Sequence, residues 1–125
     1  MNKLLPSHQL LRGLHRAPAR AMLRATGRTD ADLERPIVAV VNTWTDVTPC
    51  NLHLRELGRA LRDGIESAGG TVFEFNTIAV SDGISMGTEG MRASLVSREV
   101  IADSIELAAQ GHCVDAVVVL SLIHI

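Results

Sequence analysis

From Arg35 onward the sequence alternates between two hydrophobic periods, and this alternation limits the chain to few folds. Residues 36–42 form a continuous, mostly β-branched apolar run, which predicts a strand buried on both faces of a parallel sheet. The next apolar residues recur at three- and four-residue steps, which predicts a helix that Gly69 and Gly70 end; they are Leu54, Leu57, Leu61, Ile65 and Ala68. A strand that passes into such a helix is typical of βα units.

The same alternation continues after the two glycines. Residues 71–80 predict a second strand, and residues 81–90 a glycine-rich loop. Residues 97–110 predict a second amphipathic helix, ended by Gly111, whose inward residues are Val100, Ile101, Ile105 and Ala108. With a third strand at 115–120, we expect an α/β fold, a β-α-β-α-β portion of a parallel sheet. Right-handed crossovers place the loops that follow the strands at one sheet edge, where such folds bind ligands.

The organisation of the chain follows from its length and its two ends. A chain of 125 residues is long enough for one domain, which we place at residues 35–121 as a partial α/β domain. Residues 122–125 follow the third strand without a helix to cover it, so we expect truncation after that strand and an aberrant tail.

The first 29 residues contain no acidic residue, and arginine recurs in them every four residues, at Arg12, Arg16, Arg20, Arg24 and Arg28. This spacing keeps the basic side chains near one side of a helix. We expect residues 1–34 to form a basic helical arm packed on a larger body. The pattern also fits an organellar transit peptide, although Pro18 interrupts the helix.

Composition excludes several classes of partner. A hydrophobic fraction of 46% and a net charge of −2 are typical of a soluble globular chain, so we expect no nucleic acid partner. The apolar runs are too short to span a bilayer, so we expect no membrane partner. Two cysteines without a secretory signal favour reduced thiols and a cytoplasmic location.

Cys50 lies between the first predicted strand and the first predicted helix, in the stretch TWTDVTPCNLHL. Backbone N–H groups at a helix start favour a thiolate, which ligates metals or acts as a nucleophile. His53 follows three residues later, so a Cys/His metal pair is one interpretation, and a solvent-facing or capping histidine is the other. No CxxC spacing supports a metal site, and a lone loop cysteine without function stays an alternative.

Asp82 follows the second predicted strand in SDGISMGTEG. A carboxylate among glycines suits Mg²⁺ and an anionic substrate, whereas a plain Asp-Gly turn is the alternative. The glycine spacing matches neither a dinucleotide fingerprint nor a P-loop. We interpret Cys113 as structural, and Glu99, Asp103 and Glu106 as the solvated face of the second helix.

Four long stretches of the sequence together resemble the dihydroxy-acid/phosphogluconate dehydratase family. They are RAPARAMLRATG (16–27), VNTWTDVTPCNLHLRELG (41–58), FNTIAVSDGISMGTEGMRASLVSREVIADSIEL (75–107) and DAVVVLS (115–121). The resemblance is to the [2Fe-2S] dihydroxy-acid dehydratases of branched-chain amino-acid synthesis, and it runs from about Arg16 to Ser121.

The resemblance implies an enzyme, a carbon–oxygen lyase, with an iron-sulfur cluster and Mg²⁺. Cys50 matches the first cluster cysteine, and Asp82 matches a carboxylate ligand of Mg²⁺. In the family, an exposed cluster iron acts as a Lewis acid on the C3 hydroxyl of a 2,3-dihydroxy acid while Mg²⁺ holds its carboxylate and C2 oxygen. A base removes the C2 proton, water leaves, and a 2-keto acid forms. The full-length enzyme is expected to be a homodimer.

The sequence departs from the family after Ser121. A Cys-Asp-Lys motif is expected there, and Leu122-Ile123-His124-Ile125 stands in its place. Cys113 is too early in the motif order to replace that cysteine. The proton-abstracting serine also belongs to a region beyond this sequence, so the sequence contains no catalytic base. One thiolate does not hold a cluster, and we expect an N-terminal fragment that is inactive by itself.

Two alternatives stay open at this point. The first is an aldonate dehydratase of the same family, because residues that select the substrate lie outside the sequence. The second is a short non-catalytic α/β protein that pairs its third strand with a partner.

Overall fold

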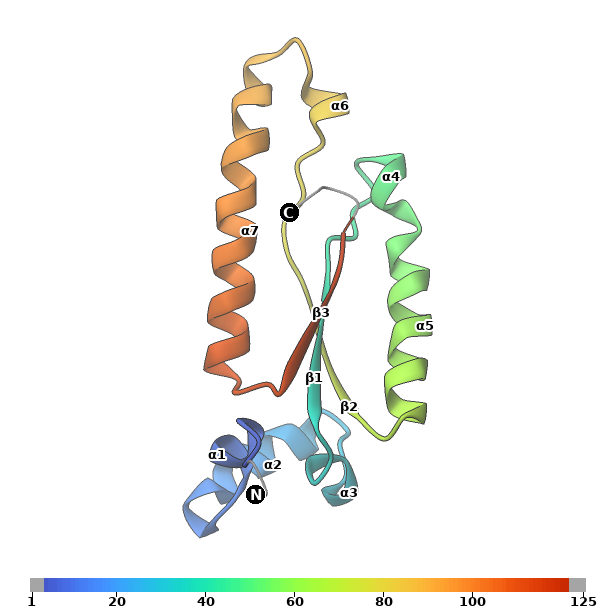
Figure 1. Cartoon of the computed structure of the whole chain (residues 1–125). Helices are drawn as coiled ribbons and strands as arrows, with labels where there is room; N and C mark the ends of the chain where they lie inside the picture. The colour runs from blue at the N-terminus through green and yellow to red at the C-terminus, as the bar shows by residue number, and fades with distance from the viewer. Residues whose placement is uncertain (1–3, 122–125) are drawn as a thin grey trace.

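The computed structural model describes residues 4–121 and shows a three-stranded parallel sheet with helices on both faces (Figure 1). The strands are β1 (Ile37–Asn42), β2 (Thr71–Asn76) and β3 (Ala116–Leu120), in the order β2-β1-β3. Asn42 at the end of β1 pairs with Asn76 on one side and with Leu120 on the other. The predicted α/β class and the parallel β-α-β-α-β order are confirmed.

The two long helices lie on opposite sides of the sheet (Figure 1). Helix α5 (Leu54–Ser67) connects β1 to β2, and helix α7 (Arg92–Gly111) leads to β3 on the other side of β1. The strand order therefore reverses between β1 and β3, which makes the crevice at their carboxyl ends the topological switch point of the sheet.

Short helices occupy both ends of the sheet (Figure 1). At the carboxyl ends of the strands lie α4 (Pro49–Leu52), α6 (Asp82–Ser85) and the 3₁₀ turn η2 (Glu89–Met91). At the amino ends lie the arm helices α1 (Ser7–Leu11), η1 (Leu14–Arg16), α2 (Ala17–Ala25) and α3 (Asp30–Leu33). The loops after β1 and β2 thus share one edge, as the crossovers predict.

The arm packs against the amino end of the sheet. Leu11 and Leu33 form a buried cluster with Ile37 at the start of β1. The carboxylate of Asp115 accepts hydrogen bonds from the backbone N–H groups of Ser7, at 2.9 Å, and Ile37, at 2.7 Å. Pro18 lies in the first turn of α2 and so begins this helix rather than interrupting it, because a proline there has no N–H to leave unpaired.

Two predicted boundaries and one predicted loop were wrong. The second strand ends at Asn76 and not at residue 80, because its partner β1 ends at Asn42, whose carbonyl accepts the last ladder bond from Thr77 at 3.0 Å. The predicted loop at 81–90 contains α6 and most of η2. Helix α7 begins at Arg92 and not at Ser97, continuing directly from η2.

The predicted inward faces were only partly right. Strand β1 is almost entirely buried, and so are Leu54 and Ile101. Leu57 in α5 is 45% exposed. Val100 is 49% exposed, because α7 turns Ser94, Ser97 and Ile101 toward the protein instead. The predicted tail at 122–125 lies outside the described residues. Within residues 4–121, no helix combines the length and the apolar character needed to cross a membrane.

Candidate metal-binding edge

Cys50 stands at the edge formed by the carboxyl ends of the strands, inside a helix of a single turn. Thr48 is the N-cap of α4, and Pro49 sets the first helical backbone angle. His53 ends α4 and precedes α5, so Cys50 lies within a separate turn and not in a loop before the long helix. The thiol of Cys50 is exposed.

A buried polar network lies beneath this turn. Asn51, next to Cys50, is 1% exposed, and its side-chain amide donates to the carbonyl of Thr43 at 2.8 Å and to its Oγ1 at 3.0 Å. Thr43 is 0% exposed, and both its backbone N–H and its hydroxyl donate to the carbonyl of Leu120 at 3.1 Å. The turn that carries Cys50 is therefore tied to β1 and to the end of β3.

A second amide ties the same loop to α5. Asn42 is 2% exposed; its Nδ2 donates to the carbonyl of Leu54 at 3.0 Å, and its Oδ1 accepts from the N–H of Trp44 at 2.9 Å. A Cβ atom at Gly58 would stand 2.7 Å from this Nδ2, so the contact needs glycine. The sequence pattern placed Asn42 in the first strand but gave no sign of its contacts with Leu54 and Gly58, because they join the strand end to residues of α5.

Asp82 is the first residue of α6, after β2, and its side chain is exposed. Its Oδ1 accepts a hydrogen bond from the N–H of Gly83 at 2.7 Å, the local bond expected of an Asp-Gly turn. The carbonyl of Ser81 accepts from the N–H of Ser85 at 3.1 Å, which closes the turn. Asp82 thus shares the carboxyl edge with Cys50 and presents a hard oxygen ligand to solvent.

Comparison with known proteins decides the family. Residues 35–122 match the family model described as dihydroxy-acid/6-phosphogluconate dehydratase N-terminal. The chain belongs to this family. The chain is 59% identical over 115 residues to a Koribacter versatilis protein named dihydroxy-acid dehydratase, and 64% identical over 115 residues to one from Thermus thermophilus. Each alignment covers 92% of the chain and 20% or 21% of the relative.

A third relative, from Roseiflexus castenholzii, has the same name and is 54% identical over 114 residues, which make up 91% of the chain and 20% of the relative. The chain therefore spans about a fifth of the length of the curated relatives it matches. The predicted resemblance to the dehydratase family is confirmed.

The exposed thiol and carboxylate of this chain match the expected iron-sulfur cluster and Mg²⁺ in ligand type but not in ligand number. A thiolate is the usual ligand of an iron-sulfur cluster, and a carboxylate is a usual ligand of Mg²⁺. Among residues 4–121, however, no three His, Cys, Asp or Glu side chains come close enough together to hold a metal ion. His53 is exposed beside Cys50 and completes no such group.

Cys113 lies at the opposite end of the sheet, in the turn between α7 and β3. Its backbone has a positive φ of 48°, and its Sγ donates to the carbonyl of Gln110 at 3.6 Å. A thiol there is separated from Cys50 by the length of the sheet, so the two cysteines do not form one ligand set.

A shallow pocket of about 360 Å³ opens beside the Cys50 loop, between the ends of β1 and β2. Trp44, Asp46 and Glu74 line it together with Arg55, whose guanidinium stands 4.8 Å from the ring centroid of Trp44. This cation–π contact braces the loop from the α5 side. The sequence pattern had singled out none of these four residues.

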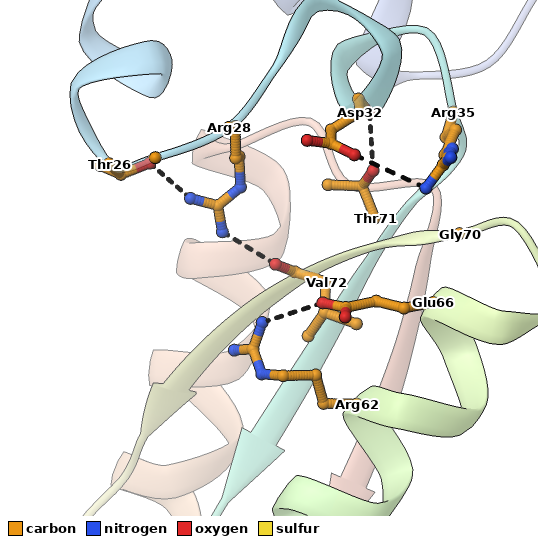
Figure 2. Close-up of a pocket in the computed structure, with 10 residues that line it drawn as sticks. Thr26, Arg28, Asp32, Arg35, Arg62, Glu66, Gly70, Thr71 and Val72 are labelled. Atoms are coloured by element: carbon orange, nitrogen blue, oxygen red, sulfur yellow. Dashed lines mark hydrogen bonds and ion pairs between the residues drawn. The ribbon is translucent and has the colours of Figure 1, made fainter.

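A polar pocket of about 420 Å³ lies at the opposite edge of the sheet, where β2 begins (Figure 2). Its charged residues are Arg28, Asp32, Arg35, Arg62 and Glu66. Arg35 pairs with Asp32 at 3.5 Å, and Arg62 pairs with Glu66 at 3.3 Å. Both acidic residues are thus paired with an arginine, and Arg28 bonds to Thr26 and to a backbone carbonyl instead. We assign no ligand to this pocket.

Arg28 fastens the arm to the sheet in this pocket (Figure 2). Its guanidinium donates to the carbonyl of Val72 at 2.8 Å and lies 4.5 Å from the ring centroid of Phe73. Burial, and next the nearby charge of Arg62, lower the pKa of Arg28. From the sheet side, the hydroxyl of Thr71 donates to the carbonyl of Asp32 at 2.6 Å.

Proposed function

We propose that this chain is the cofactor-binding N-terminal part of a [2Fe-2S] dihydroxy-acid dehydratase. The whole enzyme would convert 2,3-dihydroxy-3-methyl acids to branched 2-keto acids in valine, leucine and isoleucine synthesis, as a cytoplasmic homodimer. Family membership and the names of the relatives support this proposal. The observation that carries it is the exposure of a thiol and a carboxylate at one sheet edge, after β1 and after β2.

In this proposal Cys50 is a ligand of the cluster and Asp82 is a ligand of Mg²⁺. When bound, the cluster iron and Mg²⁺ would supply the Lewis acidity that stabilises charge on the departing hydroxyl and on the enol oxygen. The described residues act before any chemistry, by holding the thiol and the carboxylate at the sheet edge. Asn42 and Thr43 fix the loop after β1 through bonds to backbone groups.

The proposal assigns the remaining ligands and the proton-abstracting base to residues outside 4–121. A cluster needs three or four good ligands, and the described residues bring no three donors together. We therefore expect the 125-residue chain to be inactive by itself.

Cluster content of the full-length protein tests the proposed ligands. The variant Cys50→Ala should lose nearly all its iron and acid-labile sulfide and its visible absorption, whereas the matched variant Cys113→Ala should keep them. Asp82→Asn should keep the cluster and require at least tenfold more Mg²⁺ for half-maximal activity, because a neutral amide is a weaker ligand. A Cys50→Ala protein with a full cluster would refute the assignment.

The substrate is tested separately. The full-length enzyme should dehydrate dihydroxyisovalerate faster than any member of a panel of aldonates, with release of the 2-keto acid as the readout. Preference for an aldonate would place the protein with the sugar-acid members of the family and leave the cofactor assignment in place.

A further inference from the structure

We propose that Asn51, acting through Thr43, is the residue that positions Cys50 at the carboxyl edge of the sheet. The inference rests on the proposed function, because it concerns how the proposed cluster thiolate is held. It adds a positioning residue, which touches neither cofactor nor substrate.

The burial of Asn51 is the first observation. Its neighbours in α4, Cys50 and Leu52, are exposed, and Leu52 is 55% exposed, yet Asn51 is 1% exposed. Burying an amide is costly unless it is hydrogen bonded, and both bonds of its Nδ2 go to Thr43. Asn51 therefore anchors α4 to the body of the protein.

The weakness of α4 by itself is the second observation. A helix of four residues forms one turn, and one turn is not stable alone in water. Its N-cap residue, Thr48, accepts no side-chain capping hydrogen bond within the described part of the chain. The orientation of Cys50 thus depends on tertiary anchoring, which Asn51 supplies.

The partner of Asn51 extends the anchor across the sheet. Thr43 Oγ1 accepts from Asn51 at 3.0 Å and donates to the carbonyl of Leu120 at 3.1 Å. Linked hydrogen bonds of this kind polarise and strengthen one another in a buried site. One continuous chain of bonds therefore joins α4, the end of β1 and the end of β3 at the switch point.

This geometry has a consequence for the cluster. A metal ligand must be held to within a few tenths of an ångström, and loss of an orienting residue typically costs 10–100-fold in metal affinity. Removing the Asn51 amide should loosen Cys50 without removing its thiol. The cluster should then form but should be lost faster.

The test uses the full-length protein purified with its cluster. Asn51→Ala and the isosteric Thr43→Val should each release iron to a chelator about tenfold faster than the parent protein and alter the visible circular dichroism of the cluster. Thr43→Ser keeps the hydroxyl and should restore the parental rate. The matched control is Gln110→Ala on α7, which removes a side-chain amide bond to Glu106 at 2.9 Å away from the Cys50 loop and should leave the rate unchanged.

The melting temperature of the cluster-free protein separates positioning from stability. Parental iron release in Asn51→Ala and Thr43→Val would overturn the inference, as would faster release fully accounted for by a lower melting temperature. If Asn51→Ala fails to fold, Thr43→Val, with Thr43→Ser as its rescue, decides alone. A full cluster in Cys50→Ala would refute the proposed function. If Cys50→Ala has no cluster and Asn51→Ala releases iron at the parental rate, only this inference is refuted.

Discussion

The two edges of this sheet use polar side chains in opposite ways. At the carboxyl edge, neutral side chains are buried and bond to backbone groups, as Asn42, Thr43 and Asn51 do, while the thiol of Cys50 stays exposed. At the amino edge, charged side chains pair with one another and with backbone groups, as Arg28 and its neighbours do (Figure 2).

The difference separates a positioning role from a fastening role. Burying a neutral amide costs less than burying a charge, and an amide still directs its bonds to fixed atoms. It can therefore orient a neighbouring ligand without competing for the metal. At the amino edge, Arg28 and Thr71 hold the arm to the sheet through bonds to backbone carbonyls, and the ion pairs of the pocket join residues within one segment.

The largest effect is expected from Asp115 at the amino edge. Asp115→Ala removes the acceptor of two N–H groups, those of Ser7 and Ile37, both of which belong to buried residues. An unsatisfied buried donor costs about 1–3 kcal/mol, so the free energy of unfolding should fall by about 2–4 kcal/mol in urea titrations. Asp103→Ala, on the exposed side of α7, should change it by less than about 0.5 kcal/mol. Equal effects would mean that Asp115 does not clamp the arm.

The next effect tests the close packing at the carboxyl edge. In Gly58→Ala the new Cβ would meet Asn42 Nδ2 at 2.7 Å and Glu74 Oε1 at 3.1 Å, and overpacking of this kind costs about 1–3 kcal/mol. Gly64→Ala is the matched control in the same helix, with nothing within 4 Å of its Cβ, and should stabilise the protein by about 0.5–1 kcal/mol. Thermal unfolding of both variants measures the difference, and stabilisation by both would contradict the contact.

A smaller effect is expected at the capping box of the arm. Hydrogen bonds from the backbone N–H and then the hydroxyl of Thr29 lower the pKa of Asp32. Thr29→Ala should remove the N-cap, at a cost of about 1 kcal/mol, and raise the pKa of Asp32 toward its ordinary value. Carbon-13 NMR titration of the carboxyl group measures this, and Thr29→Ser should retain the lowered pKa.

The sign of the pH dependence follows from that shift. The pKa of Asp32 is lower in the folded protein than in the unfolded chain. Its contribution to the free energy of unfolding is therefore complete at a pH above the ordinary aspartate pKa of about 3.9. The contribution is lost as the pH falls through the lowered pKa of the folded protein. The free energy of unfolding should fall more steeply on acidification in the parent protein than in Thr29→Ala. An equal fall in the two proteins would contradict the capping box.

The smallest effect is expected from added salt, whose influence on hydrogen exchange can be compared directly between the two edges. Raising sodium chloride to about 1 M screens partly exposed ion pairs such as Arg62–Glu66, each worth a few tenths of a kcal/mol. Hydrogen exchange at the N–H of Thr71, beside these pairs, should become about twofold faster. Exchange at the N–H of Asn51 should not change, because neutral hydrogen bonds hold that turn. An equal salt response at both edges would show that charge pairing does not distinguish them.

Much of the fold and part of the site could be predicted from the pattern of residues. The apolar run before Thr43 and the helical spacing after Leu54 sufficed for β1 and α5, and the order of elements placed Cys50 and Asp82 at one edge. The second strand was predicted too long because Ile78 continues its apolar pattern, although β1 offers no further residue to pair with.

The sequence by itself determined the fold class and the family, since both depend on patterns that neighbouring residues along the chain carry. The tertiary structure alone decided that Asn51 is buried while Cys50 is exposed, and that Gly58 meets Asn42. Those facts depend on segments far apart in the chain, such as Thr43 and Leu120, which are 77 positions apart. Burial is a property of which segments meet, and local periodicity does not contain that information.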